Sequence, residues 1–102
     1  MRLVLAGNPN VGKSVLFNRI TGIGVISANY PGTTVSFEEG VVTYEGKRIS
    51  VFDLPGTYSL AGTTEDEKVA TDLLFEKRPD CVIAVVDATR LEQNLVLVLQ
   101  LI

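Results

Sequence analysis

The octapeptide Gly7-Asn8-Pro9-Asn10-Val11-Gly12-Lys13-Ser14 fits the pattern G-x-x-x-x-G-K-[ST] at every fixed position. Its glycines allow backbone N–H groups to converge on phosphate oxygens, and a helix that follows adds the positive end of its dipole. Lys13 can then reach the β- and γ-phosphates, while Ser14 can offer its hydroxyl to Mg²⁺. The alternative is a chance glycine turn with a lysine that faces solvent.

The segments on either side of this octapeptide have the order that a phosphate loop requires. Residues 3–6 form a short apolar run, which predicts a buried strand. Residues 13–21 have a helical pattern, with Leu16 and Ile20 four positions apart and Gly22 as a natural stop. Strand, loop and helix follow one another, which argues against the chance turn.

The middle of the chain predicts loops and one hairpin. Residues 22–34 lack a clean period and are predicted to form a long mobile loop, which is usually functional in a compact domain. Residues 35–44 alternate roughly between apolar and polar, and Glu45-Gly46 offers a tight turn into residues 47–53, which predicts an antiparallel hairpin. Residues 54–63 are predicted to form another loop.

The last third of the chain predicts a helix, a strand and a second helix. Thr64 and Glu67 match a capping box. Residues 81–86 form an apolar run typical of a parallel strand covered on both faces, in which Cys81 is expected to be a buried, inert thiol. The first helix is expected to have a stripe of Val69, Ala70, Leu73 and Leu74 and to end at Lys77, Arg78 and Pro79; the second begins near Leu91.

The predicted order β–α–β–β–α–β–α implies a three-layer α/β fold of the P-loop type, with a mostly parallel sheet and one antiparallel hairpin. Nothing follows the last strand to cover its outer edge, and natural domains avoid long apolar edges. Residues 1–102 are therefore expected to be the incomplete, N-terminal portion of a larger nucleotide-binding domain. Self-association through the exposed strand edge is a further hypothesis.

Composition excludes several other functions. The net charge of −3 and the pI near 4.8 argue against a nucleic-acid surface. The absence of histidine removes the usual general base and the usual zinc ligand, and a single cysteine allows no internal disulfide. The apolar runs at residues 81–86 and 95–99 are both far short of a membrane span. The chain itself is expected to be soluble and cytoplasmic.

A second motif, Asp53-Leu54-Pro55-Gly56, closes an apolar run, as the acidic motif of P-loop proteins does. Asp53 can hold Mg²⁺ through a water, and the Gly56 N–H can sense a γ-phosphate. An ordinary turn is the alternative, but the position after a complete phosphate loop favours the functional interpretation.

Three further sets of polar residues have open interpretations. Thr33 and Thr34 could complete a Mg²⁺ shell or could equally be strand-entry residues chosen for β-propensity. Asp87 is expected to cap the next helix rather than to reach the site. The acidic residues 65–67 are expected first as helix N-terminal charges and only second as catalytic carboxylates.

Four stretches together resemble the translation-factor-like class of GTPases, and most closely the G domain of the ferrous iron transport protein B (FeoB) family. They are Gly-Asn-Pro-Asn-Val-Gly-Lys-Ser at 7–14, Asn-Tyr-Pro-Gly-Thr-Thr-Val at 29–35, Asp-Leu-Pro-Gly-Thr-Tyr-Ser-Leu at 53–60 and Asp-Ala-Thr-Arg-Leu-Glu-Gln-Asn-Leu at 87–95. The first stretch alone fits many GTPases, whereas the other three are much more specific. The resemblance covers essentially the whole chain.

The resemblance assigns roles to particular residues. It implies that residues 22–34 are switch I and 54–64 are switch II, and that Thr34 joins Ser14 and Asp53 in binding Mg²⁺. Asn10 matches the asparagine that binds an activating K⁺ in related enzymes, with carbonyls near Ala28 and Tyr30; a turn residue that tolerates unusual backbone angles is the alternative. The implied catalytic residues are Lys13, Asn10, Thr34 and Gly56, and the implied nucleotide contacts are Asn8, Pro9, Asn10, Val11, Gly12, Lys13, Ser14, Val15, Thr33, Thr34, Asp53 and Gly56.

Thr57 occupies the position at which Ras-like enzymes place a water-orienting glutamine. No other side chain is an obvious general base, so slow hydrolysis by positioning and charge neutralisation is expected. If Thr57→Ala abolished hydrolysis while binding stayed intact, this expectation would be wrong.

The function implied by the resemblance is a GTP- and GDP-binding, slowly hydrolysing switch that regulates Fe²⁺ uptake. The expected partner is the membrane-embedded transporter domain of the same full-length protein, which places this domain at the cytoplasmic face of the membrane. No Asn-x-x-Asp occurs after Asp87, so guanine preference comes from the resemblance alone. The alternatives are a soluble Era-like GTPase of ribosome or RNA maturation and a truncated half-domain that binds nucleotide without hydrolysis.

Overall fold

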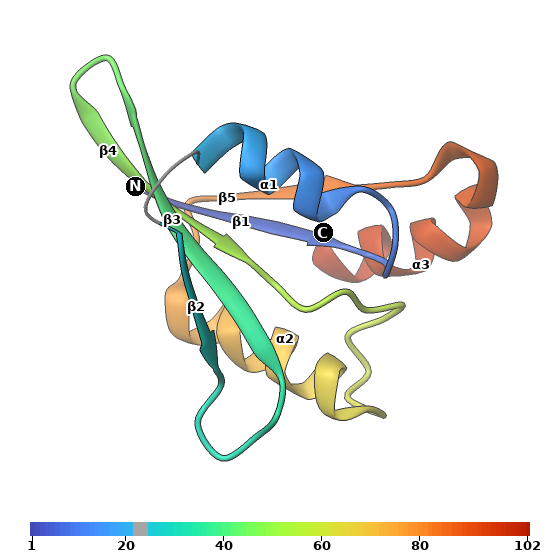
Figure 1. Cartoon of the computed structure of the whole chain (residues 1–102). Helices are drawn as coiled ribbons and strands as arrows, with labels where there is room; N and C mark the ends of the chain where they lie inside the picture. The colour runs from blue at the N-terminus through green and yellow to red at the C-terminus, as the bar shows by residue number, and fades with distance from the viewer. Residues whose placement is uncertain (22–24) are drawn as a thin grey trace.

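The computed structural model describes residues 1–21 and 25–102. Its elements form a single five-stranded sheet, in the order β2-β3-β4-β1-β5, with helices on both faces (Figure 1). The elements are β1 (Arg2–Gly7), α1 (Lys13–Thr21), β2 (Ile26–Asn29), β3 (Ser36–Tyr44), β4 (Lys47–Asp53), α2 (Glu65–Lys77), β5 (Cys81–Val85), the 3₁₀ turn η1 (Ala88–Arg90) and α3 (Leu91–Leu101).

The central strand β1 organises three layers. It pairs in parallel with β4 on one side and with β5 on the other. Because side chains alternate along a strand, Leu5 packs with Phe17 of α1, while Val4 and Ala6 pack on the opposite face with the apolar stripe of α2. The predicted three-layer α/β fold is confirmed, and so is the buried stripe of α2.

The long loop predicted over residues 22–34 is interrupted by a strand, so this prediction is wrong for residues 26–29. β2 pairs antiparallel with β3, from Ile26 opposite Glu39 to Asn29 opposite Ser36. All four β2 residues are exposed, so backbone pairing with β3 holds the strand. Its sequence lacks the apolar alternation that would predict a strand. The sheet therefore has two antiparallel pairings rather than one. Residues 22–24 of the predicted loop lie outside the described residues.

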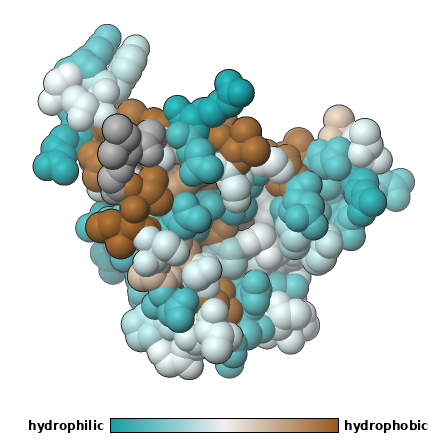
Figure 2. Space-filling view, viewed as in Figure 1, coloured by the Kyte–Doolittle hydropathy of each residue, from teal (hydrophilic) through white to brown (hydrophobic). Residues whose placement is uncertain are grey.

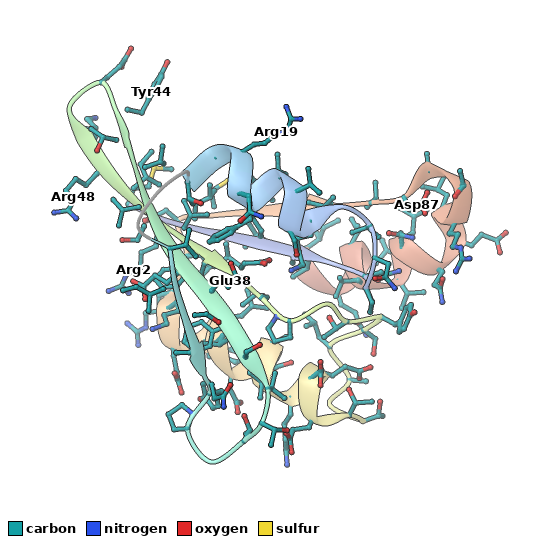
Figure 3. The ribbon with its side chains drawn as sticks, in the orientation of Figure 1. Arg2, Arg19, Glu38, Tyr44, Arg48 and Asp87 are labelled. Atoms are coloured by element: carbon teal, nitrogen blue, oxygen red, sulfur yellow. The ribbon has the colours of Figure 1, made fainter. Side chains whose placement is uncertain are left out.

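The predicted hairpin of residues 35–53 is confirmed. Glu45 and Gly46 connect β3 to β4 with φ angles of 51° and 77°, as a two-residue turn that matches strand twist requires. The hairpin extends beyond the helices, and Figure 3 shows Tyr44 and Arg48 near its tip, away from the rest of the molecule.

Of the two hydrogen bonds of the predicted capping box, the start of α2 has one. The Thr64 side chain accepts a hydrogen bond from the Glu67 N–H at 3.1 Å, as predicted. The Glu67 carboxylate, however, accepts from the N–H of Thr63 rather than from that of Thr64. The helix ends at Lys77, where Arg78 adopts a left-handed conformation before Pro79.

The predicted parallel strand over residues 81–86 is confirmed as β5 (Cys81–Val85), but the prediction that both its faces are covered is wrong. β5 is an edge strand in the described part of the chain, and none of its residues is fully buried. Cys81, at the start of β5, is exposed rather than buried. An apolar run shows that a strand is suited to burial but not whether a neighbouring element covers it.

Figure 2 shows a face that is mostly hydrophilic or neutral, with hydrophobic residues gathered next to α1 and the start of β2. Among the residues that the structure describes, no helix combines the length and the apolar character needed to cross a bilayer.

Candidate functional site

The phosphate loop connects the end of β1 to the start of α1, where its backbone needs two unusual conformations. Asn10 and Gly12 have φ angles of 65° and 89°, which glycine adopts freely and asparagine tolerates. The turn-residue interpretation of Asn10 is therefore correct for its backbone. Gly7 is needed for another reason: a Cβ there would lie 2.7 Å from the carbonyl oxygen of Val85 in β5.

The Lys13 ammonium is buried and directed at the end of β4. It forms an ion pair with the Asp53 carboxylate and donates a hydrogen bond of 2.6 Å to the carbonyl of Leu54. Lys13 and Asp53 are 8% and 7% exposed, and a buried charge is tolerated only when it is paired. The structure thus joins the cation of the first motif to the carboxylate of the second.

Two adjoining cavities meet at this ion pair. One, of about 570 Å³, is lined by the phosphate loop and Val15. The other, of about 390 Å³, is lined by the ends of β3 and β4 and by Thr34. Both cavities share Lys13, Ser14, Gly56 and Asp66. Ligands of such sheets bind at the carboxyl ends of the strands, which is where both cavities lie.

The donor set in the second cavity suits Mg²⁺. The predicted ligands Ser14, Thr34 and Asp53 all line it, and they supply the oxygen donors that this cation prefers. Asp66 lines both cavities as well, although the sequence suggests first a helix N-terminal role; α2 indeed begins at Glu65.

The structure separates the two threonines that the sequence leaves equivalent. The Thr33 hydroxyl donates to the Tyr30 carbonyl at 2.9 Å and accepts from the Val35 N–H at 3.1 Å, so it closes a local turn. Thr34 is exposed, lines the cavity, and donates to the Glu65 carboxylate over a long 3.4 Å. Only Thr34 is therefore placed to reach a ligand.

The predicted K⁺ ligands are brought together only in part. Asn10 is exposed and lines the phosphate cavity. The Tyr30 carbonyl already accepts hydrogen bonds from both the N–H and the hydroxyl of Thr33. Ala28 lies within β2, opposite Phe37.

Residues 54–64, the predicted switch II, begin in direct contact with the phosphate loop. A Cβ at Gly56 would lie 2.9 Å from the Cα of Pro9, so a glycine allows this close approach. The N–H of the buried Thr57 donates to the Gly7 carbonyl at 3.0 Å. The two segments are therefore in direct backbone contact.

A buried carboxylate that sequence reasoning placed only at a helix start holds the far end of switch II. Glu67 accepts hydrogen bonds from the Ser59 hydroxyl at 3.2 Å and from the Thr63 hydroxyl at 2.9 Å. The Thr63 hydroxyl bond is the main cause that lowers the pKa of Glu67 below its ordinary value. The only sequence signal that could have indicated this cluster is the presence of the acid Glu67 shortly after the hydroxyl residues Ser59 and Thr63.

Asp87 caps the short 3₁₀ turn η1, whereas α3, the helix that the sequence expects it to cap, begins after Arg90 without a side-chain cap. Its Oδ1 accepts from the Thr89 hydroxyl at 2.7 Å and from the Thr89 N–H at 2.9 Å, and these bonds lower the pKa of Asp87. Figure 3 shows Asp87 at the junction between β5 and α3, beyond the end of the sheet.

Comparison with known proteins decides the family. The family model described as "Ferrous iron transport protein B" matches residues 1–102. The chain belongs to this family. It is 50% identical to the Fe(2+) transporter FeoB of Methanocaldococcus jannaschii over 99 residues, which are 97% of this chain and 15% of that protein. It is 44% identical over 101 residues to the FeoB of Leptospira biflexa, again 15% of that protein.

Solved FeoB structures show the same fold. The G domain of T. maritima FeoB superposes with a TM-score of 0.89 at 50% identity, covering 97% of this chain and 62% of that one. A GDP-bound mutant of the S. thermophilus FeoB G domain gives 0.89 at 46% identity, covering 99% and 39%. The fold is thus that of a P-loop NTPase, and the chain corresponds to part of a FeoB G domain.

Proposed function

We propose that residues 1–102 are the N-terminal, phosphate-binding portion of a GTP-binding domain that regulates Fe²⁺ transport. The observation that carries this proposal is the convergence of Lys13, Ser14, Thr34, Asp53 and Gly56 on two adjoining cavities. Support comes from the GDP bound to the S. thermophilus relative and from the transporter names of the full-length relatives.

Each group of the site has a defined task in this proposal. The phosphate-loop N–H groups cradle the phosphates, and Lys13 leaves Asp53 to neutralise the β- and γ-phosphates. Ser14, Thr34 and Asp53 would hold Mg²⁺, which when bound supplies charge neutralisation at the phosphate oxygens. The remaining nucleotide contacts would come from residues 8–12 and Val15, and Asn10 would hold K⁺; Thr33, whose hydroxyl closes a local turn, is not among them.

Hydrolysis by this site is expected to be slow. Thr57 is buried and offers its N–H to Gly7, and its hydroxyl is too weak a base to activate water. The Gly56 N–H, Lys13 and Thr34 orient and stabilise the transferring phosphoryl group, which is positioning rather than proton transfer. The domain then acts as a switch at the cytoplasmic face of the membrane, read by the membrane-embedded part of the same protein.

Fluorescence titration with mant-GDP and mant-GTP in the presence of Mg²⁺ tests the proposal. Binding to the wild-type chain is expected, and Lys13→Ala should weaken it about 100-fold or more, because a charge-assisted contact of 2–5 kcal/mol is lost. Lys47→Ala, on the exposed hairpin, is the matched control and should bind like the wild type. Absence of binding by the wild type, or equal loss in both variants, would overturn the proposal.

Competition with ATP separates base preference from phosphate binding. A domain that reads guanine should retain mant-GDP against excess ATP, whereas a half-domain that holds only phosphates should release it. Inorganic phosphate release from GTP, compared between wild type and Thr57→Ala, then tests whether hydrolysis proceeds without that side chain.

A further inference from the structure

Leu60 lies in the middle of the predicted switch II, residues 54–64, at the point where this segment meets α3. Its N–H donates a hydrogen bond of 2.5 Å to Oε1 of Gln100, which is 40 residues further along the chain. A backbone N–H can only donate, so the carboxamide oxygen and not the NH₂ group must face Leu60. A side chain of α3 is thus bonded directly to the backbone of switch II.

The Leu60 side chain agrees with this placement. It is half-buried and packs against the core cluster that includes the apolar stripe of α2, and so does Leu101, the neighbour of Gln100. Leu97, one turn earlier in α3, is only 2% exposed. Positions three and four residues apart share one face of a helix. Leu97, Gln100 and Leu101 therefore lie on the face of α3 that is turned toward the rest of the molecule.

The contact of Leu60 with α2 is weaker than its contact with α3. The Leu60 carbonyl lies 3.5 Å from the Thr71 hydroxyl, but the single proton of this hydroxyl has a better acceptor in the Glu67 carbonyl, at 2.9 Å. The bonds at the two ends of switch II, made by Thr57 and Thr63, each lie three residues away. The bond to Gln100 is therefore the stronger of the two that join the Leu60 backbone to a helix.

The middle of switch II matters because the same segment carries the Gly56 N–H, the group proposed to sense a γ-phosphate. A segment that is already ordered loses less conformational entropy when a ligand orders it further. The hydrogen bond at Leu60 restricts the backbone shortly after Gly56. Gln100 lines neither of the two cavities described above, so any effect of Gln100 on a nucleotide would be exerted through switch II.

We propose that Gln100 is a positioning residue for switch II: its carboxamide oxygen holds the Leu60 N–H on α3 and keeps the segment ordered for a γ-phosphate. The hydrogen bond itself is a property of the chain and needs no nucleotide. Its effect on the preference between nucleotides rests on the proposed function.

Exchange of the Leu60 amide proton with water, measured by NMR, tests the hydrogen bond without a nucleotide. Gln100→Met keeps the length and the helix propensity of the side chain but removes the oxygen acceptor, so the exchange should be about two- to tenfold faster. Gln100→Glu keeps an acceptor and should keep the protection. Leu99→Met introduces the same side chain at a position that is 71% exposed and should leave the exchange unchanged. Unchanged exchange in Gln100→Met would overturn the proposal.

Titration with mant-GTP and mant-GDP tests the effect on the site. Gln100→Met should bind mant-GTP about threefold more weakly, because one net hydrogen bond is lost, and should bind mant-GDP like the wild type. Gln100→Glu and Leu99→Met should bind both nucleotides like the wild type. Faster Leu60 exchange with unchanged or tighter mant-GTP binding, or an equal loss for both nucleotides, would overturn the positioning role. If the wild type binds neither nucleotide, the proposed function fails, and the exchange of Leu60 still decides whether Gln100 holds switch II.

Discussion

The phosphate loop and the switch II segment of residues 54–64 meet at the same cavities but are held in different ways. The loop continues from the central strand, and Gly7 packs directly against the backbone of β5. Switch II is tied at one end by Thr57 and at the other by the polar cluster around Glu67, while Tyr58 and Ala61 between them are exposed. Segments held by a few polar bonds open at lower cost than segments packed in a core. The cradle is therefore fixed and its neighbour is adjustable.

The largest effect on stability is expected when a side chain is forced between the phosphate loop and β5. Gly7→Ala places a Cβ 2.7 Å from the Val85 carbonyl oxygen, and both partners are backbone in a sheet. Overpacking of this kind costs about 1–3 kcal/mol, which lowers the melting temperature of a domain this size by roughly 5–20 °C. Thermal unfolding followed by circular dichroism measures it.

Ser27→Ala, on exposed β2, is the control for Gly7→Ala and should change stability by less than about 0.5 kcal/mol. If Gly7→Ala were as stable as this control, the β1–β5 contact could shift to accommodate a side chain. The phosphate loop would then be no more fixed than switch II.

A glycine-to-alanine substitution in switch II should lower stability less than Gly7→Ala does. Gly56→Ala places a Cβ 2.9 Å from the Pro9 Cα, but switch II can shift to relieve it, so the cost is expected at the low end of the range of about 1–3 kcal/mol. The Gly56 N–H is then displaced, so mant-GTP affinity should fall several-fold while mant-GDP affinity is retained. Equal losses for both nucleotides would indicate that Gly56 belongs to the fixed cradle.

The far anchor of switch II should be dependent on pH. The pKa of Glu67 is lowered in the fold, chiefly by the Thr63 hydroxyl. Its contribution to stability is thus present above its ordinary value of 4.5 and is lost as pH falls through the lower folded value. Glu67→Gln should remove that part of the acid dependence and accelerate amide hydrogen exchange in residues 59–64.

Glu76→Gln, on the exposed surface of the same helix, is the control for the exchange experiment and should leave residues 59–64 protected. Unchanged exchange in Glu67→Gln would mean that packing rather than the carboxylate holds this end of switch II.

The smallest effect is expected at a surface bond between the β2–β3 turn and α2. The Tyr30 hydroxyl donates to the Glu76 carboxylate, which raises the pKa of Tyr30 from 10.0 to about 12. This contribution is complete below pH 10 and is lost as pH rises through about 12. An ultraviolet titration should show a late tyrosinate step that is absent in Tyr30→Phe and retained in Tyr58→Phe.

Local rules account for the parts of the molecule that the sequence predicts well. The phosphate loop, the bounds of α1, the Glu45-Gly46 turn and the Thr64 cap each depend on residues close together in the chain. β2 was missed because its only support is a backbone ladder to another strand. The exposure of Cys81 was missed for a similar reason, because burial depends on neighbours that a strand's own composition does not specify.

The candidate site likewise has residues that local motifs predict and contacts that they do not predict. Motifs identify Lys13, Ser14, Asp53 and Gly56, and the structure places them around shared cavities. The ion pair of Lys13 with Asp53 and the cluster around Glu67 each join side chains contributed by different segments. Such contacts follow from the packing of the sheet, so no local pattern predicts them.

The pairing of Lys13 with Asp53 has a thermodynamic consequence. An anion that draws Lys13 away leaves Asp53 buried without a counter-charge, and a cation that takes Asp53 releases Lys13. Each ligand therefore removes the free-energy cost of breaking the ion pair that the other ligand would otherwise have to meet. By linkage, an anion and a cation that bind here would raise each other's affinity by the same factor, so a single ion pair would couple two ligands of opposite charge.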